Sequence, residues 1–96
     1  MANPRKAQKP RAGTSNYRAD LVIGGKESFL CFDDHYEDLF NRIIESLLHI
    51  ERRDRIQSVK IYRWNGVADA GQWVHSTTKP MTAFKKRLEE LEADMP

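Results

Sequence analysis

The residues of this 96-residue chain that could carry chemistry gather at one place, Cys31, Asp33 and His35. A cysteine with a histidine and a carboxylate nearby could form an activated thiolate nucleophile. However, Cys31 lies between Leu30 and Phe32 in an extended stretch, where a cysteine usually behaves as a small hydrophobic residue. The aspartates have a sufficient role as helix caps. We therefore expect a protein without catalytic residues, with a Cys/His enzyme as the last of three alternatives.

Metal and cofactor sites are not expected either. His35 and His49 lie fourteen residues apart on one predicted helix, which separates them by about 21 Å and prevents them from sharing a metal ion. The single cysteine excludes a zinc site of several thiolates and an internal disulfide, and it favours a reducing compartment such as the cytoplasm. Gly24-Gly25 joins two predicted strands, so it lacks the helix N-terminus of a phosphate-binding loop.

An aromatic segment, residues 60–76 (KIYRWNGVADAGQWVHS), is the main candidate for a binding site. Alternation along a strand places every second residue on the same face. If the two tryptophans pair across a hairpin, one face carries five candidate protein-binding residues. They are Lys60, Tyr62, Trp64, Trp73 and His75.

Two interpretations of this aromatic face remain open. In the first, the last helix covers the face, and Phe84 and Leu88 pack on the tryptophans as part of a small core. In the second, both helices lie on the other side of the sheet, against Val59, Ile61 and Val74. The aromatic face is then open, either as a protein-binding hot spot or as a base-stacking platform.

A β-hairpin is predicted over residues 17–23 and 26–32. The segment YRADLVI alternates apolar and polar residues, and Gly24-Gly25 is a signal for a tight turn that needs positive φ angles. A two-residue loop pairs Ile23 with Lys26 and, further along, Tyr17 with Phe32.

An amphipathic helix is predicted within residues 33–55. Asp33 or Asp34 can cap its start, with Glu37 completing a capping box. Asp38 and Arg42 have the spacing of an ion pair on the solvent face. The apolar residues recur at three-four spacing: Tyr36, Leu39, Phe40, Ile43, Ile44, Leu47 and Leu48.

Two more strands, near residues 56–64 and 72–76, precede a second helix that begins near Pro80. The element order ββαββα predicts one small α+β domain over residues 17–96. Its sheet is four-stranded and mainly antiparallel, with two helices.

The first sixteen residues are predicted to form a disordered basic arm. They contain no aromatic or branched aliphatic residue, so they cannot bury enough apolar surface to offset the entropy of ordering. Residues 1–18 carry +5 and the remaining chain −3, which together give the net charge of +2. The arm could contact nucleic-acid phosphates through Arg5, Lys6, Lys9 and Arg11. No stretch of the chain has the apolar length of a signal peptide or a membrane span.

The last helix has a charge order that opposes its macrodipole. Its first half is basic, with Lys85 and Lys86, and its second half is acidic, with Glu89 and Glu90. A second copy packed antiparallel would set each basic half against an acidic half, whereas a solvated helix would leave the charges unmatched. We therefore predict a homodimer through this helix, along a narrow apolar seam. The seam comprises Met81, Phe84, Leu88, Leu91 and Met95.

The leading hypothesis is a small non-enzymatic protein-binding module, an accessory regulator or inhibitor of a larger assembly. It would act through the aromatic hairpin, the C-terminal helix or both. The alternative is a nucleic-acid-binding protein that uses the basic arm and the aromatic face. The acidic balance of residues 19–96 favours the protein partner, because stacking platforms usually lie in a positive groove.

Overall fold

The computed structural model describes residues 16–67 and 70–94. Residues 1–15 of the predicted arm (residues 1–16), with Arg5, Lys6, Lys9 and Arg11, lie outside the described residues, as does Met95; Asn16 is described. The element order confirms the predicted ββαββα arrangement of an α+β fold. The elements are β1 (Tyr17–Ile23), β2 (Lys26–Asp33), α2 (Tyr36–Leu48), η1 (Arg53–Arg55), β3 (Ile56–Val67), β4 (Ala70–Pro80) and α3 (Thr82–Ala93).

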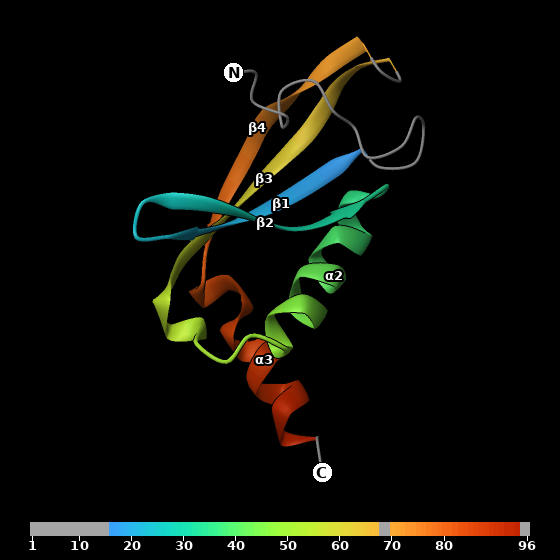
Figure 1. The fold of residues 1–96 in the computed structure, drawn as a ribbon. Helices are drawn as coiled ribbons and strands as arrows, with labels where there is room; N and C mark the ends of the chain where they lie inside the picture. The colour runs from blue at the N-terminus through green and yellow to red at the C-terminus, as the bar shows by residue number, and fades with distance from the viewer. Residues whose placement is uncertain (1–15, 68–69, 95–96) are drawn as a thin grey trace.

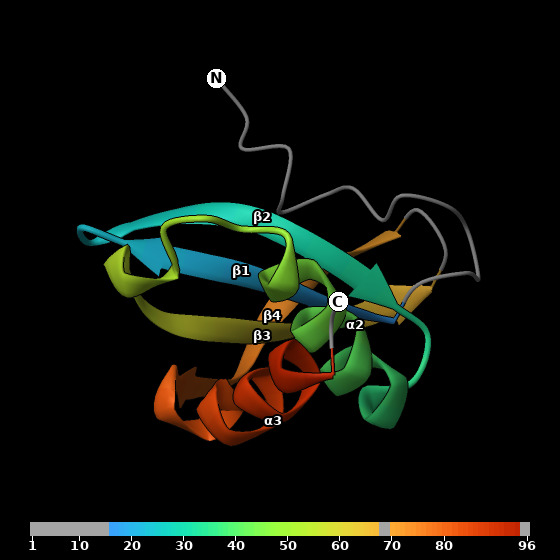
Figure 2. The same cartoon turned by 90° about the horizontal axis from the view of Figure 1, so that it is seen from below.

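The four strands form one antiparallel sheet in the order β2-β1-β3-β4. Both helices lie on the same face of this sheet (Figure 1), and from below they cover it side by side (Figure 2). The interpretation in which α3 covers the tryptophans is therefore wrong. Phe84 of α3 instead packs against Phe40 of α2, with 5.2 Å between the ring centroids.

The core lies between the two helices and the strands β1 and β3. Its members alternate along the strands and recur at three-four spacing along α2, as the apolar pattern predicts. Val59 and Ile61 are buried as expected, but Val74 is only half-buried and lies outside the core cluster. The buried core residues are Ala19, Leu21, Cys31, Leu39, Ile43, Ile44, Leu47, Ile56, Val59, Ile61, Phe84 and Leu88.

The first hairpin departs from its predicted register. The pairing is correct near the Gly24-Gly25 turn, but it shifts just after Ala19, so that Tyr17 lies opposite Asp33 and not opposite Phe32. The cause is a β-bulge, in which β2 accommodates one residue more than β1. The bulge moves Cys31 to the helix-covered face and Phe32 to the opposite face.

The start of α2 also differs from the prediction. His35 is the N-cap residue, and no side chain caps the helix, so the capping box at Asp34 does not form. The Asp33 carboxylate accepts a hydrogen bond from the backbone N–H of His35 (3.3 Å) and another from Nε of Arg42 (2.8 Å). The predicted Asp38–Arg42 pair is wrong because the Arg42 side chain turns toward Asp33.

The Arg53 side chain contacts both the end of α2 and α3. The helix ends at Leu48, earlier than the predicted stretch, and the Arg53 guanidinium donates to the carbonyl oxygen of Leu47 (3.1 Å). The same guanidinium pairs with the carboxylate of Glu92 on α3 (2.6 Å). The Leu47 carbonyl also accepts from the backbone N–H of Ile50 (3.1 Å), so the cation adds a second donor to a carbonyl in the last turn of the helix.

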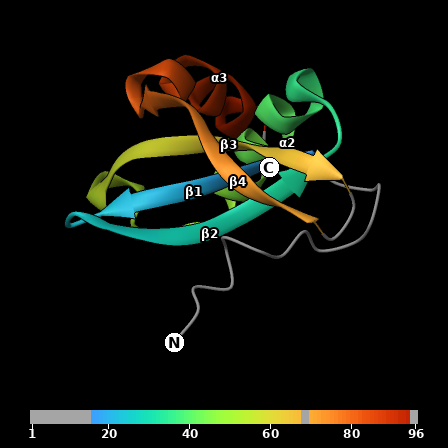
Figure 3. The same ribbon diagram turned by 90° about the horizontal axis from the view of Figure 1, so that it is seen from above.

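The sheet curls strongly away from the helices. Its outer strands, β2 and β4, are separated by two other strands, which in a flat sheet would place them about 14 Å apart. Nevertheless, the rings of Phe32 on β2 and Trp73 on β4 stack with 5.8 Å between their centroids. In the view of Figure 3, β4 crosses in front of β1 and approaches β2. We call the side opposite the helices the concave face.

Candidate protein-binding face

The structure brings all five predicted protein-binding residues to the concave face. In the β3–β4 register, Trp64 lies opposite Trp73 and Tyr62 opposite His75, while Lys60 lies two residues before Tyr62 on the same face. The sequence analysis places these residues on one face if the two tryptophans pair across the hairpin, and the structure has that pairing. The five residues therefore form one surface and not two.

Two glycines allow the hairpin to close next to the tryptophans. Gly66 has a φ of 138° and lies opposite Gly71. A Cβ atom on Gly66 would overlap the carbonyl oxygen of Ala70, and one on Gly71 would lie 3.0 Å from the Trp64 indole. Glycine is thus required at Gly66 for the strands to approach and for that backbone conformation.

A continuous row of aromatic contacts crosses the concave face. The Trp64 and Trp73 rings meet edge to face at 5.2 Å, and Trp73 stacks on Phe32 at 5.8 Å. Phe32 in turn contacts Phe29 at 4.4 Å. The sequence pattern did not assign Phe29 and Phe32 to this surface. The β-bulge places both side chains on the same face, and no residue type or spacing in the sequence indicates that bulge.

A buried ion pair lies beneath these rings. The guanidinium of Arg18 lies 5.0 Å from the Phe29 centroid and 5.8 Å from the Phe32 centroid, which is cation–π geometry. Its Nε donates to the Asp20 carboxylate at 2.7 Å. Arg18 is 7% exposed and Asp20 0% exposed. Strand alternation places both residues on the face away from the predicted core, so the pattern did not indicate this second buried cluster.

A second polar cluster lies along the same face. The Glu27 carboxylate accepts hydrogen bonds from the Tyr62 hydroxyl and from the Lys60 ammonium group, the latter at 3.4 Å. Arg18 and Lys60 balance Asp20 and Glu27, so the formal charges of these four residues sum to zero. The aromatic row therefore lies beside charges that are paired with one another.

The exposed part of this face differs from the prediction. Trp64 is only 7% exposed, so its side chain lies beneath the surface and is not accessible to a partner. Phe29, in contrast, is 46% exposed. We define the aromatic contact surface by its half-buried or exposed members, which are Phe29, Phe32, Tyr62, Trp73 and His75.

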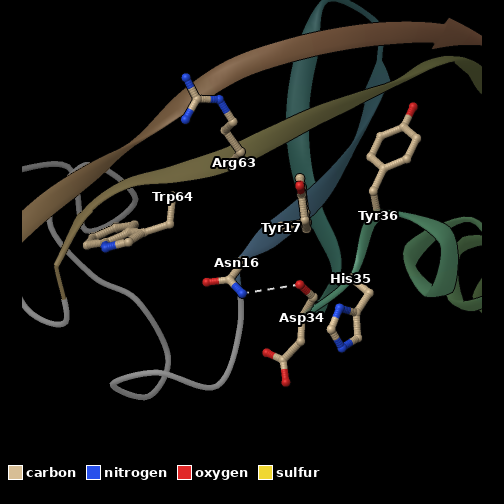
Figure 4. A pocket seen from close by; sticks show the side chains of 7 residues that line it. All are labelled: Asn16, Tyr17, Asp34, His35, Tyr36, Arg63 and Trp64. Atoms are coloured by element: carbon tan, nitrogen blue, oxygen red, sulfur yellow. Dashed lines mark hydrogen bonds between the residues drawn. The ribbon is translucent and has the colours of Figure 1, made fainter.

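A shallow pocket of about 280 Å³ lies at one end of the sheet, where β1 begins beside the β2–α2 junction (Figure 4). The amide of Asn16 donates to the backbone oxygen of Asp34 across it (3.2 Å). Within the described residues, Asp34 Oδ1 and Trp64 Nε1 are buried without a hydrogen-bond partner, but in the view of Figure 4 the Trp64 indole and Asp34 lie on opposite sides of Asn16. The two orphan atoms therefore do not converge on one ligand position. The lining residues are Asn16, Tyr17, Asp34, His35, Tyr36, Arg63 and Trp64.

Cys31, Asp33 and His35 are not arranged as a nucleophile and its base. Burial raises the pKa of the Cys31 thiol to about 12, although Arg42 and Ser46 partly oppose this rise. Partial burial also acts to raise the pKa of Asp33, but hydrogen bonds from Arg42 and from backbone N–H groups outweigh it and lower that pKa. Asp33 is thus committed to Arg42, and His35 is exposed at the helix start.

The predicted dimer seam on α3 is largely used inside the chain. Phe84 and Leu88 are buried in the core, and Met81 and Leu91 pack partly against it. Phe84 and Leu88 are therefore not freely accessible to a second copy, which corrects their predicted role. The charged residues Lys85, Lys86, Glu89 and Glu90 are exposed.

Comparisons with known proteins give no assignment: no family model, no curated protein and no solved structure matches this chain. Within the described residues, no group of three or more histidine, cysteine or acidic side chains is placed to hold a metal ion. None of the helices found there has the length and apolar character needed to cross a membrane.

The buried ion pair predicts a large loss of stability when it is broken. Arg18→Met leaves the Asp20 charge buried without its arginine, so we expect about 3–5 kcal/mol lower free energy of unfolding. Arg42→Met removes the largely exposed arginine of the Asp33 pair, which lies at the surface, and should cost about 0–1 kcal/mol. Urea denaturation of both variants measures the difference. Equal decreases in the free energy of unfolding for the two variants would contradict a special stabilising role of the Arg18–Asp20 pair.

The raised pKa of Cys31 predicts an unreactive thiol. A pKa raised from 9.0 to about 12 lowers the thiolate fraction about 1000-fold at neutral pH, so iodoacetamide should alkylate the native protein far more slowly than free cysteine. Stability should also fall between about pH 9 and 12, because the unfolded thiol ionises there while the folded thiol stays protonated. The unfolding free energy of wild type minus that of Cys31→Val isolates this effect. A pH-independent difference would show that the thiol is not desolvated.

Proposed function

We propose that this chain is a small non-enzymatic protein-binding module that contacts its partner through the aromatic contact surface. The observation that carries the proposal is Phe29, which is nearly half exposed although it lies on the Arg18 guanidinium and against Phe32. A large apolar ring held in place and left accessible has the character of a binding hot spot.

The surface is already ordered before a partner binds. Phe32 is held between Phe29 and Trp73, and Tyr62 is held by the Glu27 carboxylate and the His75 ring. Ordering side chains on association costs free energy, so side chains that the fold already fixes contribute more of their contact energy to affinity. Aromatic rings in this state suit a partner that presents an aliphatic or aromatic side chain.

The charges favour a protein partner over a nucleic acid. Single-stranded nucleic acids bind in positive grooves, where cations track the phosphates beside the stacked bases. On this face Arg18 is buried against Asp20, and Lys60 is paired with Glu27. The nucleic-acid alternative would therefore depend on the basic arm, through Arg5, Lys6, Lys9 and Arg11.

We extend the proposal to a role as an accessory regulator or inhibitor in the cytoplasm, the compartment that the single cysteine favours. A domain of this size with a preformed contact surface acts by occupying or bridging surfaces of a larger assembly. The proposal includes no chemical step, which agrees with a protonated Cys31 and an Asp33 carboxylate engaged by Arg42.

Phe29→Ala tests the proposal. We expect the purified partner, obtained by affinity capture from lysate of the source cells, to bind this variant at least about 30-fold more weakly than wild type. Ile23→Ala is the matched control, because Ile23 is 39% exposed but lies at the hairpin tip away from the aromatic row. Isothermal titration calorimetry measures both affinities, and circular dichroism checks that both variants fold.

Capture with and without nuclease separates the two hypotheses. A partner retained after nuclease treatment and lost with Phe29→Ala supports the protein-binding module. Capture that nuclease abolishes, or an affinity that falls steeply with added salt and is unaffected by Phe29→Ala, would overturn it in favour of nucleic-acid binding.

A further inference from the structure

A groove of about 410 Å³ lies between η1 and α3, on a different side of α3 from the buried Phe84. Most of the surface area that lines it is apolar, although six of its eight lining residues are polar or charged. The residues from α3 recur every three or four positions, so the groove follows the length of the helix. In Figure 2, α3 lies at the margin of the helix layer farthest from β2. The groove is lined by Arg53, Asp54, Met81, Thr82, Lys85, Leu88, Glu89 and Glu92.

The charges along α3 are only partly matched within the described residues. The helix has no acidic residue in its first turn and no basic residue in its last turn, which opposes the macrodipole at both ends. Two ion pairs involve its acidic half, Arg53–Glu92 and Arg87–Glu90. In the described part of the chain, Lys85 and Glu89 form no ion pair, although both line the groove.

We propose that the groove is occupied by α3 of a second copy of this chain, packed antiparallel about a two-fold axis that passes near the middle of the helix. In that arrangement Lys85 of one copy lies opposite Glu89 of the other, and symmetry repeats the pair. Met81 supplies the accessible apolar contact, while Leu88, which is 4% exposed, lines the groove from its own core. The basic half of each helix faces the acidic half of its neighbour. The contact uses the groove side of α3 and leaves Phe84 in its own core.

The dimer is independent of the proposed function. Because α3 lies on the opposite side of the sheet from the concave face (Figure 1), pairing through α3 leaves both aromatic contact surfaces accessible. The dimer would then present two copies of that surface, which raises the avidity for any partner with two matching sites. A single helix pair is a small interface, so the association should be weak and reversible.

Sedimentation equilibrium of the full chain tests the pairing. We expect wild type to shift from monomer to dimer in the micromolar range, and added NaCl to weaken the dimer because the pairs are exposed. Lys85→Glu and Glu89→Lys should each weaken self-association at least about tenfold. Both changes improve the match to the helix macrodipole, so the weakened association would not reflect an unfolded helix.

Mixing the two variants is the decisive measurement. Lys85→Glu cannot pair with itself, because each copy then carries acidic side chains at both facing positions. Glu89→Lys carries lysines at both positions, so one copy of each variant restores two opposite-charge contacts. An equimolar mixture should therefore recover a dimer at least as stable as wild type. Lys86→Glu is the control, because it makes the same charge change at the next residue, which does not line the groove. It should leave the dimer dissociation constant unchanged.

Three results would overturn the proposal. Wild type that stays monomeric at several hundred micromolar would show that the groove does not bind a second copy. A mixture that remains monomeric would show that residues 85 and 89 do not face each other. A loss with Lys86→Glu equal to that with Lys85→Glu would show a nonspecific charge effect.

Discussion

The buried pair of Arg18 and Asp20 is the constraint on which the concave face depends. Neither α2 nor α3 covers that side of the sheet, so these two charges would remain in water if the sheet were flat. The curl brings Phe32 and Trp73 together above them and removes them from solvent. Desolvated charges are tolerated only when they are paired, and the pairing at 2.7 Å between adjacent same-face residues of one strand meets that need. The burial of the ion pair therefore depends on the curl of the sheet.

This arrangement divides the protein into two small cores with different chemistry. The helix-covered core is mainly aliphatic and sets the fold, while the concave cluster is aromatic and charged. Because the second cluster is closed only by its own side chains, its outermost member, Phe29, stays accessible. The proposed interaction surface thus lies where no helix covers the sheet, and α3 lies on the other side of the sheet.

The sequence predicts those features that depend on local periodicity. The apolar spacing of α2, the strand alternation and the Gly24-Gly25 turn all give the right elements in the right order. The extra residue in β2 has no local signature, and it exchanges the faces of Cys31 and Phe32. The heptad-like pattern of α3 shows that the helix has one apolar side, but not whether that side meets its own core or a second chain. The packing of Phe84 on Phe40 decides that, and it is a tertiary property.

Trp64 shows why exposure could not be inferred from helix placement alone. The two interpretations of the aromatic face linked burial to a helix above it and accessibility to its absence. The structure separates these properties, because Trp64 is 7% exposed on the face opposite the helices. Trp73 packs edge to face on its ring, and Gly71 approaches its indole from the neighbouring strand. A long, twisted hairpin can therefore bury its own large residues. In the proposed binding face, the accessible ring is Phe29 at the rim and not the tryptophan at the base.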